Sequence, residues 1–170
     1  MKYIILFLYF LPLRLCAQDS LMNAIDKEIN DIDEKIGKNK FGMDTVTKIE
    51  EEYEQRYIVA FYEKKNLRKV SVSTSDGAAG DISGTTRYYF KDGELIFIVA
   101  VKSYFMAGGC GETGKIYFNK ANFARLITET DCRGEKAAEL RMYLGDYTFD
   151  LKRIWEEYQL DTVDAFRKKN

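Results

Sequence analysis

The sequence contains no histidine, and this absence bears directly on function. Histidine is the side chain most often used as a general base and as a ligand for transition metals. Without it, the 170-residue chain cannot form the Ser-His or Cys-His pairs of common hydrolases. No other motif for catalysis or cofactor binding stands out. The sequence therefore predicts a non-catalytic protein with no cofactor and no metal site.

Proline occurs once and cysteine three times, and neither acidic nor basic residues dominate. The formal net charge of −1 does not favour sequence-independent nucleic-acid binding, which needs a basic surface. After the first residues, the chain has no apolar run long enough to span a bilayer. We therefore expect a soluble protein whose partner is a protein, a peptide or an envelope component. Its oligomeric state stays open.

The first residues have the pattern of a signal peptide. Lys2 supplies the positive start, residues 3–13 form a short apolar run, and Ala17 is a small residue suited to cleavage. Cleavage there would leave residues 18–170 as a single domain that is exported to the periplasm or the medium. The alternative is a lipoprotein acylated at Cys16, although the residue before it is not small.

The centre of the chain, residues 87–105, predicts a β-hairpin with its turn at Asp92 and Gly93. The Asp-Gly pair favours a type I′ turn, in which both central residues need a positive φ. A two-residue turn would place Tyr89 opposite Ile96, and Tyr88 opposite Phe97. The return strand is apolar on both faces, which is typical of a central, covered strand.

This aromatic pattern occurs three times at an offset of 28 residues, which predicts three hairpins in series. The paired aromatics are Phe61-Tyr62, Tyr89-Phe90 and Tyr117-Phe118.

An apolar stripe predicts a helix that begins at the capping pair Asp19-Ser20 and ends at Gly37. Helical spacing also predicts two C-terminal helices, at residues 135–144 and 149–160, with Trp155 packed against the sheet. The expected fold is α+β, with an N-terminal helix, an antiparallel meander of about six to seven strands, and C-terminal helices.

The strings from Tyr88 to Ile96 and from Ile116 to Ile127 resemble a group of uncharacterised exported bacterial proteins with repeated aromatic hairpins. They are also loosely similar to MORN-type hairpin repeats. The resemblance covers residues 55–130, and its third copy lacks the turn glycine. It implies a sheet of hairpins and no catalytic residues.

Cys110 and Cys132 are predicted to form a disulfide, because the destination of an exported protein is oxidising. In the expected register both lie at the open end of the third hairpin. Their spacing is not that of a Cys-x-x-Cys redox motif. Two cysteines without histidine would also make a poor zinc site.

Three kinds of function stay open. We expect a binding module whose sheet presents tyrosines to a partner, because tyrosine is enriched at interfaces; the candidates are Tyr57, Tyr62, Tyr88, Tyr89, Tyr104 and Tyr117. The alternative is a structural envelope protein. Less favoured is a hydrolase that uses Glu112, Glu129 and Asp131, which we expect on or beside glycine-rich loops. Those loops are expected at residues 75–86 and 106–114.

Overall fold

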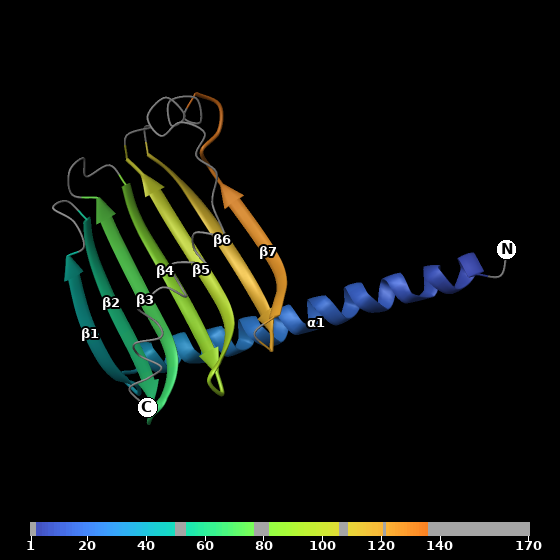
Figure 1. The fold of residues 1–170 in the computed structure, drawn as a ribbon, viewed down its shortest axis with the longest axis horizontal. Helices are drawn as coiled ribbons and strands as arrows, with labels where there is room; N and C mark the ends of the chain where they lie inside the picture. The colour runs from blue at the N-terminus through green and yellow to red at the C-terminus, as the bar shows by residue number, and fades with distance from the viewer. Residues whose placement is uncertain (1–2, 50–53, 77–81, 106–108, 121, 136–170) are drawn as a thin grey trace.

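The computed structural model describes residues 3–49, 54–76, 82–105, 109–120 and 122–135 (Figure 1). The chain forms one long helix followed by strands, which are α1 (Tyr3–Gly37), β1 (Gly42–Ile49), β2 (Glu54–Glu63), β3 (Asn66–Asp76), β4 (Ile82–Lys91), β5 (Glu94–Tyr104), β6 (Cys110–Asn119) and β7 (Asn122–Thr130). Each strand pairs antiparallel with the next, so the seven-stranded sheet has the order β1-β2-β3-β4-β5-β6-β7. The predicted antiparallel meander is confirmed. The predicted C-terminal helices lie outside the described residues.

The three hairpins share one irregularity. The pairing register shifts between Phe61 and Tyr62 in the first hairpin, and the later shifts follow at intervals of 28 residues, at Tyr89/Phe90 and Tyr117/Phe118. Each shift is a bulge, in which one residue of the returning strand has no partner opposite it. The extra residues are Arg68, Ile96 and Ala124. The aromatic repeat in the sequence is therefore a repeat of bulged hairpins.

The bulge corrects the predicted pairing of the central hairpin. Lys91 faces Glu94, as the two-residue turn requires, but Tyr89 faces Phe97 rather than Ile96. Because Ile96 is the extra residue, every pair beyond it is displaced by one position. The Tyr89 and Phe97 rings pack with their centroids 5.8 Å apart.

The turn residues have the expected backbone conformation. Asp92 has a φ of 50° and Gly93 a φ of 80°, as the type I′ turn requires. The outer hairpins also turn in two residues, because Glu63 faces Asn66 and Asn119 faces Asn122.

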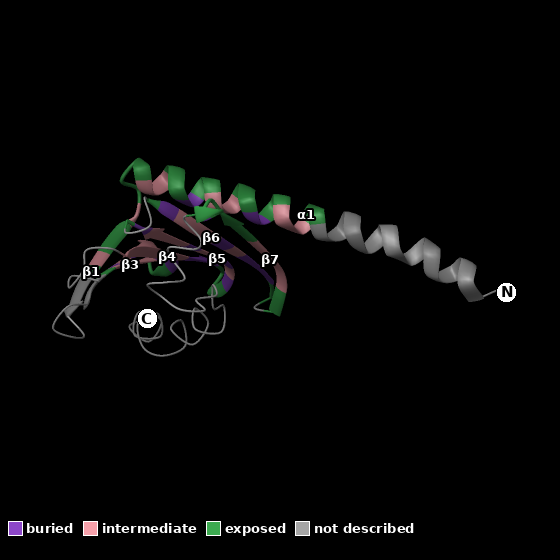
Figure 2. Ribbon diagram, turned by 90° about the horizontal axis from the view of Figure 1, so that it is seen from above, coloured by how far each residue is buried: buried purple, intermediate pink, exposed green. Residues whose placement is uncertain are grey.

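Helix α1 begins at Tyr3, not at the predicted cap Asp19-Ser20. A capping side chain is needed only where backbone N–H groups lose their partners, and here the helix continues through that point. The predicted stripe does face the sheet, with Ile25 and Ile32 buried. Figure 2 shows the helix lying along one face of the sheet. Among the described residues, no helix is long and apolar enough to cross a membrane.

Two segments that were predicted to be loops are partly strands. Residues 82–86 belong to β4 and residues 110–114 to β6. Their glycines fit the sheet because neighbouring groups come close: a Cβ at Gly111 would lie 3.1 Å from the carbonyl oxygen of Lys102. Glycine is used here for close approach between strands rather than for a bend.

The sheet has a separate apolar cluster on each face. The helix-side cluster joins Ile25 and Ile32 of α1 to Tyr89, Phe97 and Tyr117. The cluster on the other face contains only sheet residues among those described, and its buried members are Ile58, Ala60, Leu67, Val70, Tyr88, Phe90, Leu95, Ile98, Ala100, Ile116 and Phe118. The central strand β5 contributes to both clusters, as its apolar sequence predicts.

Ion pairs attach α1 to the first two hairpins. Glu28 of the helix lies between Arg68, the bulge residue of β3, and Lys91, whose Nζ is 2.9 Å from the Glu28 carboxylate. The Arg68 side chain is only 9% exposed, so little water competes for it. Burial raises the pKa of Glu28, but hydrogen bonds and charge from Lys91 and Arg68 outweigh it and lower the pKa.

We predict that Glu28→Gln destabilises the protein by roughly 2–3 kcal/mol, between the values typical of exposed and of buried ion pairs. Because the folded-state pKa of Glu28 is lowered, its contribution is present above the ordinary glutamate pKa of about 4.3 and is lost as the pH falls below it. Urea unfolding at several pH values measures this. Glu34→Gln, whose partner Lys38 lies on the same exposed helix surface, is the control and should have little effect. Equal effects of the two substitutions would contradict the prediction.

We also predict that Gly93→Val lowers the free energy of unfolding by about 1–3 kcal/mol, because a β-branched residue is strained at positive φ. No atom lies within 4 Å of a Cβ built there, so the loss reports backbone strain rather than a clash. Gly37→Val is the matched control, because that site is equally open without a positive φ. An unchanged urea midpoint for Gly93→Val would exclude the type I′ turn.

Candidate functional site

The structure places most of the candidate tyrosines in the interior. Tyr88, Tyr89, Tyr104 and Tyr117 are buried, and Tyr62 is half-buried. Only Tyr57 is well exposed, with 48% of its surface accessible. The six tyrosines therefore do not form one exposed face, and those in the interior contribute to packing.

Two buried tyrosines bind the helix through their hydroxyl groups. Tyr89 donates a hydrogen bond to Asp33 over 3.1 Å, and Tyr117 donates to Asp26 over 3.0 Å. Burial, with the neighbouring Asp26 carboxylate, raises the pKa of Tyr117 to about 12. Burial and Asp33 raise the pKa of Tyr89 in the same way. Both hydroxyls therefore stay protonated and remain donors that hold α1 on the sheet.

The helix leaves part of its own face of the sheet uncovered. α1 crosses the sheet over Tyr89, Phe97 and Tyr117, near the hairpin turns. Beyond that row, the alternating residues of β2 to β6 point to the same side, and we call them the open face: Tyr57, Val59, Ser71, Ser73, Thr85, Arg87, Val99, Val101, Thr113 and Lys115. Apart from the exposed Tyr57, these side chains are half-buried. Hydroxyl groups and two cations lie among three valines, Val59, Val99 and Val101.

Arg87 lies at the middle of the open face. It is on β4, paired across the sheet with Ser71 on one side and Val99 on the other. No residue that the structure describes forms an ion pair with it. Thr85 is its neighbour along the strand, and the Thr85 hydroxyl lies 3.5 Å from that of Ser73. A half-buried guanidinium among hydroxyls is suited to binding a carboxylate or phosphate group with its two parallel N–H donors.

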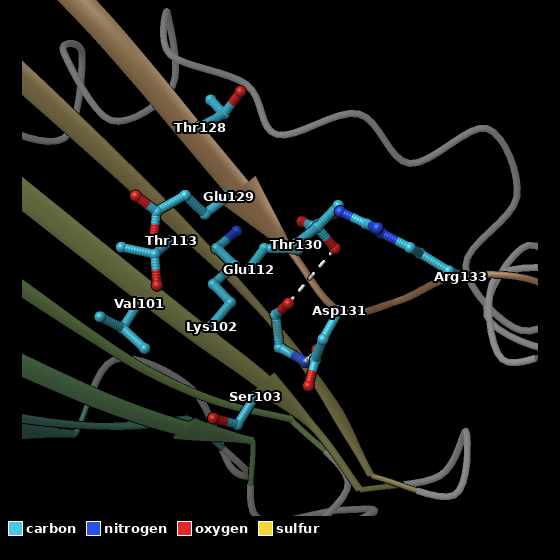
Figure 3. A pocket seen from close by; sticks show the side chains of 11 residues that line it. Val101, Lys102, Ser103, Glu112, Thr113, Thr128, Glu129, Thr130, Asp131 and Arg133 are labelled. Atoms are coloured by element: carbon cyan, nitrogen blue, oxygen red, sulfur yellow. Dashed lines mark hydrogen bonds between the residues drawn. The ribbon is translucent and has the colours of Figure 1, made fainter.

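A cleft of about 570 Å³ adjoins the open face at the ends of β5, β6 and β7 (Figure 3). Val101 and Thr113 belong both to the open face and to the cleft. The rest of the lining is mostly polar and includes Lys102, Ser103, Glu129, Asp131 and Arg133. The helix-side part of the cleft, which includes Val101, Thr113 and Glu129, continues the open face. Lys102, Glu112 and Thr130 alternate with these residues and point to the opposite face of the sheet.

The three candidate carboxylates all line this cleft, but each already has a partner. Tyr104 donates to Glu112 over 3.2 Å, and Lys115 pairs with Glu129 at 3.2 Å. Asp131 accepts a hydrogen bond from the backbone N–H of Gly111. These contacts join neighbouring strands and close the end of the sheet. The three carboxylates thus lie at one end of the sheet in contacts that hold the fold. Glu112 points to the face opposite that of Glu129, because it alternates with Thr113, the partner of Glu129.

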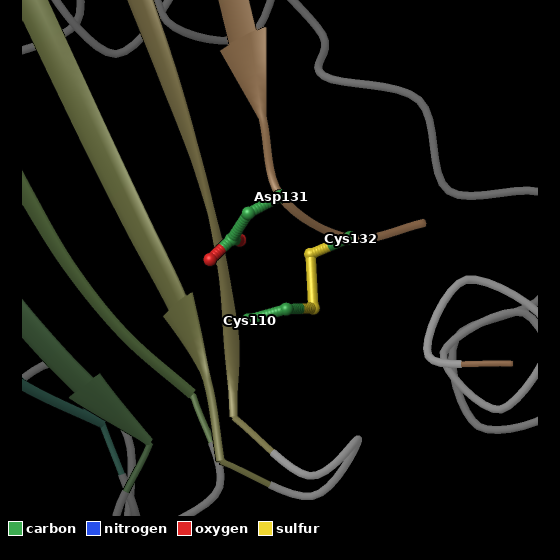
Figure 4. A group of neighbouring side chains, drawn as sticks. All are labelled: Cys110, Asp131 and Cys132. Carbon is green, nitrogen blue, oxygen red and sulfur yellow. A yellow bond between two sulfur atoms is a disulfide. The ribbon is translucent and has the colours of Figure 1, made fainter. Parts of the chain in front are cut away.

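Cys110 and Cys132 form the predicted disulfide, with their sulfur atoms 2.13 Å apart and their Cα atoms 5.1 Å apart (Figure 4). The bulge explains why these two cysteines can bond: it shifts the register of β6 and β7 by one residue, which brings Cys132 opposite Cys110. Asp131 lies beside the bridge, and its carboxylate and the two sulfurs are within 4.8 Å of one another. Sulfur atoms bonded to each other are not thiolates, which is the form that holds metals, so this group is a bridge.

The open face was not identified from the sequence, although its signal is present. Ser71-Val72-Ser73 and Thr85-Thr86-Arg87 alternate so that hydroxyls and a cation fall on one side of the strands. Which side stays uncovered depends on where α1 lies. Strand alternation alone does not contain that information.

No protein-family model matches the chain, and the searches of curated proteins and of solved structures found no similar protein. The candidate site is therefore described by its own residues: the open face around Arg87 and the adjoining cleft.

We predict that protein secreted into an oxidising compartment has no reactive thiol until it is reduced, and two afterwards. The reason is that Cys110 and Cys132 are bonded to each other, and Cys16 lies within the expected signal peptide. Labelling with a thiol reagent before and after reduction, followed by mass spectrometry, measures the number of thiols. Two labelled thiols without reduction would contradict the bridge. The bridge should contribute roughly 3 kcal/mol through the loop that it closes.

Proposed function

We propose that this chain is a non-catalytic, exported binding module, and that the open face around Arg87 binds its ligand. The observation that carries the proposal is Arg87 itself, a half-buried cation on a central strand without an ion-pair partner among the described residues. Burying part of a charge without a partner is costly, so such a group favours an anionic ligand.

The ligand that fits this surface is an acidic saccharide chain of the cell envelope. Arg87 lies in the same cross-strand row as Lys115, which also pairs with Glu129. The two cations are two strands apart, which corresponds to roughly 10 Å. The hydroxyls of Ser71, Ser73, Thr85 and Thr113 can exchange hydrogen bonds with sugar hydroxyl groups. The ring of Tyr57 at the border of the surface offers an exposed apolar contact.

Export is supported by the Cys110–Cys132 bridge, which is compatible with an oxidising destination. The signal-like start of the sequence, with cleavage expected after Ala17, agrees with it. Periplasmic or extracellular placement would also bring the protein to envelope polymers.

One observation favours a second candidate, a carboxylate-dependent hydrolase: Glu112, Glu129 and Asp131 line one cleft. Retaining and inverting glycosidases need two carboxyl groups that keep separate roles as acid and as nucleophile or base. The present contacts to Tyr104, Lys115 and Gly111 instead tie each carboxylate to the fold. We therefore place binding ahead of hydrolysis.

We predict that Arg87→Gln weakens binding of an oligogalacturonate by about tenfold or more, because a hydrogen bond to a charged group contributes roughly 1.5–3 kcal/mol. Titration calorimetry with the purified mature protein measures this. Lys120→Gln, which removes an exposed cation at the β6–β7 turn, is the control and should leave affinity unchanged. A neutral malto-oligosaccharide should bind more weakly than the acidic one.

The same titrations distinguish the alternatives. Equal affinity of wild type and Arg87→Gln for the acidic saccharide would contradict a site at Arg87. Inorganic phosphate that binds as tightly as the saccharide would assign the site to a simple anion. Release of reducing ends, abolished by Glu129→Gln in a folded protein, would establish the hydrolase in place of the binding module.

A further inference from the structure

The face of the sheet opposite α1 is buried without a visible cover among the described residues. Ile58, Ala60, Val70 and Ile98 are each 0% exposed. All members of this cluster belong to β2 to β7, and α1 lies on the other face. A sheet buries residues of one face completely only when another layer packs on it. The layer that covers this face therefore lies outside the described residues.

We propose that the C-terminal segment, residues 136–170, is that second layer and docks on this face as an amphipathic helical segment. It is the only undescribed stretch of sufficient length, since the internal undescribed stretches, at residues 50–53, 77–81, 106–108 and 121, are short. Helices rise about 1.5 Å per residue, so 35 helical residues extend about 50 Å. Seven strands spaced about 4.8 Å apart are about 30 Å wide, which one such segment can cross.

The disulfide places the start of this segment on the correct face. Ile82, Tyr104, Cys110 and Cys132 form one cluster. Ile82 pairs with Tyr104, and Tyr104 with Cys110, along a row on the side of Ile98 and Ala100. Because Cys132 is bonded to Cys110 in this row, the chain that follows it leaves from the face that needs a cover.

The sequence of the segment fits an apolar sheet face. Leu151, Ile154, Trp155 and Tyr158 recur at spacings of three, one and three residues, so a helix would present them along one stripe. Charged residues such as Lys152, Arg153, Glu156 and Glu157 fall between them. Trp155 is the only tryptophan of the chain, so its fluorescence reports on this segment alone.

The first test is the fluorescence of Trp155 in the full mature protein under native conditions. We expect blue-shifted emission and strong protection from acrylamide, both lost on unfolding. Emission typical of water-exposed tryptophan in a protein with a native circular dichroism spectrum would overturn the proposal.

The second test locates the segment with a matched pair of quenchers. Thr85 and Thr86 are neighbours on β4, and both are half-buried, but their side chains point to opposite faces. Thr86→Cys, labelled with a nitroxide, should quench Trp155 several-fold more strongly than labelled Thr85→Cys. Circular dichroism of both labelled proteins confirms that they are folded. Equal quenching, or stronger quenching from position 85, would overturn the proposal.

A second copy of the chain is the competing occupant. Labelled protein is therefore mixed with an excess of unlabelled Trp155→Phe protein, which cannot contribute a signal. Quenching within one chain is unaffected by this dilution, as the proposal requires. A loss of quenching on dilution would assign the cover to another copy and overturn the proposal.

Discussion

The structure depends on the contact between α1 and the bulged ends of three hairpins. Each bulge adds one residue to the returning strand, and the extra residues Arg68, Ile96 and Ala124 all contact α1 or its apolar cluster. The middle of the contact is apolar, while charged pairs flank it. A helix fits across an antiparallel sheet at this place because the bulges repeat at a constant interval and present equivalent positions on neighbouring hairpins.

The two faces of the sheet consequently have different roles. On the helix side, α1 covers only the row near the turns, and the remaining surface is rich in hydroxyl groups. On the other side, eleven buried apolar residues form a continuous layer across β2 to β6. Exposing one such side chain costs roughly 1.5–3 kcal/mol, so leaving several exposed would exceed the net stability of a typical domain, about 5–15 kcal/mol. Burial of that face contributes to stability, and the ligand site that we propose lies on the helix side instead.

The tyrosines illustrate why residue type is a weak guide to a site. Tyrosine is common both at interfaces and in protein interiors, because its ring packs against apolar groups while its hydroxyl needs one hydrogen-bond partner. Tyr89 and Tyr117 find that partner in aspartates of α1, which are 56 and 91 residues away in sequence. These two tyrosines therefore join helix to sheet. Arg87, which has no ion-pair partner in the described part of the chain, lies in no distinguishing motif.

Local chemistry determined the hairpins, the Asp92-Gly93 turn, the apolar stripe of α1 and the bridge between Cys110 and Cys132, because turn preference, periodicity and register act over short distances. The sequence alone did not determine the bulges, the strand character of residues 82–86 and 110–114, or the point where α1 begins. Each of these depends on neighbours supplied by distant parts of the chain. Only the tertiary structure decided which side of each strand is covered, since alternation defines two faces and the packing of α1 chooses between them. The open face around Arg87 follows from that choice.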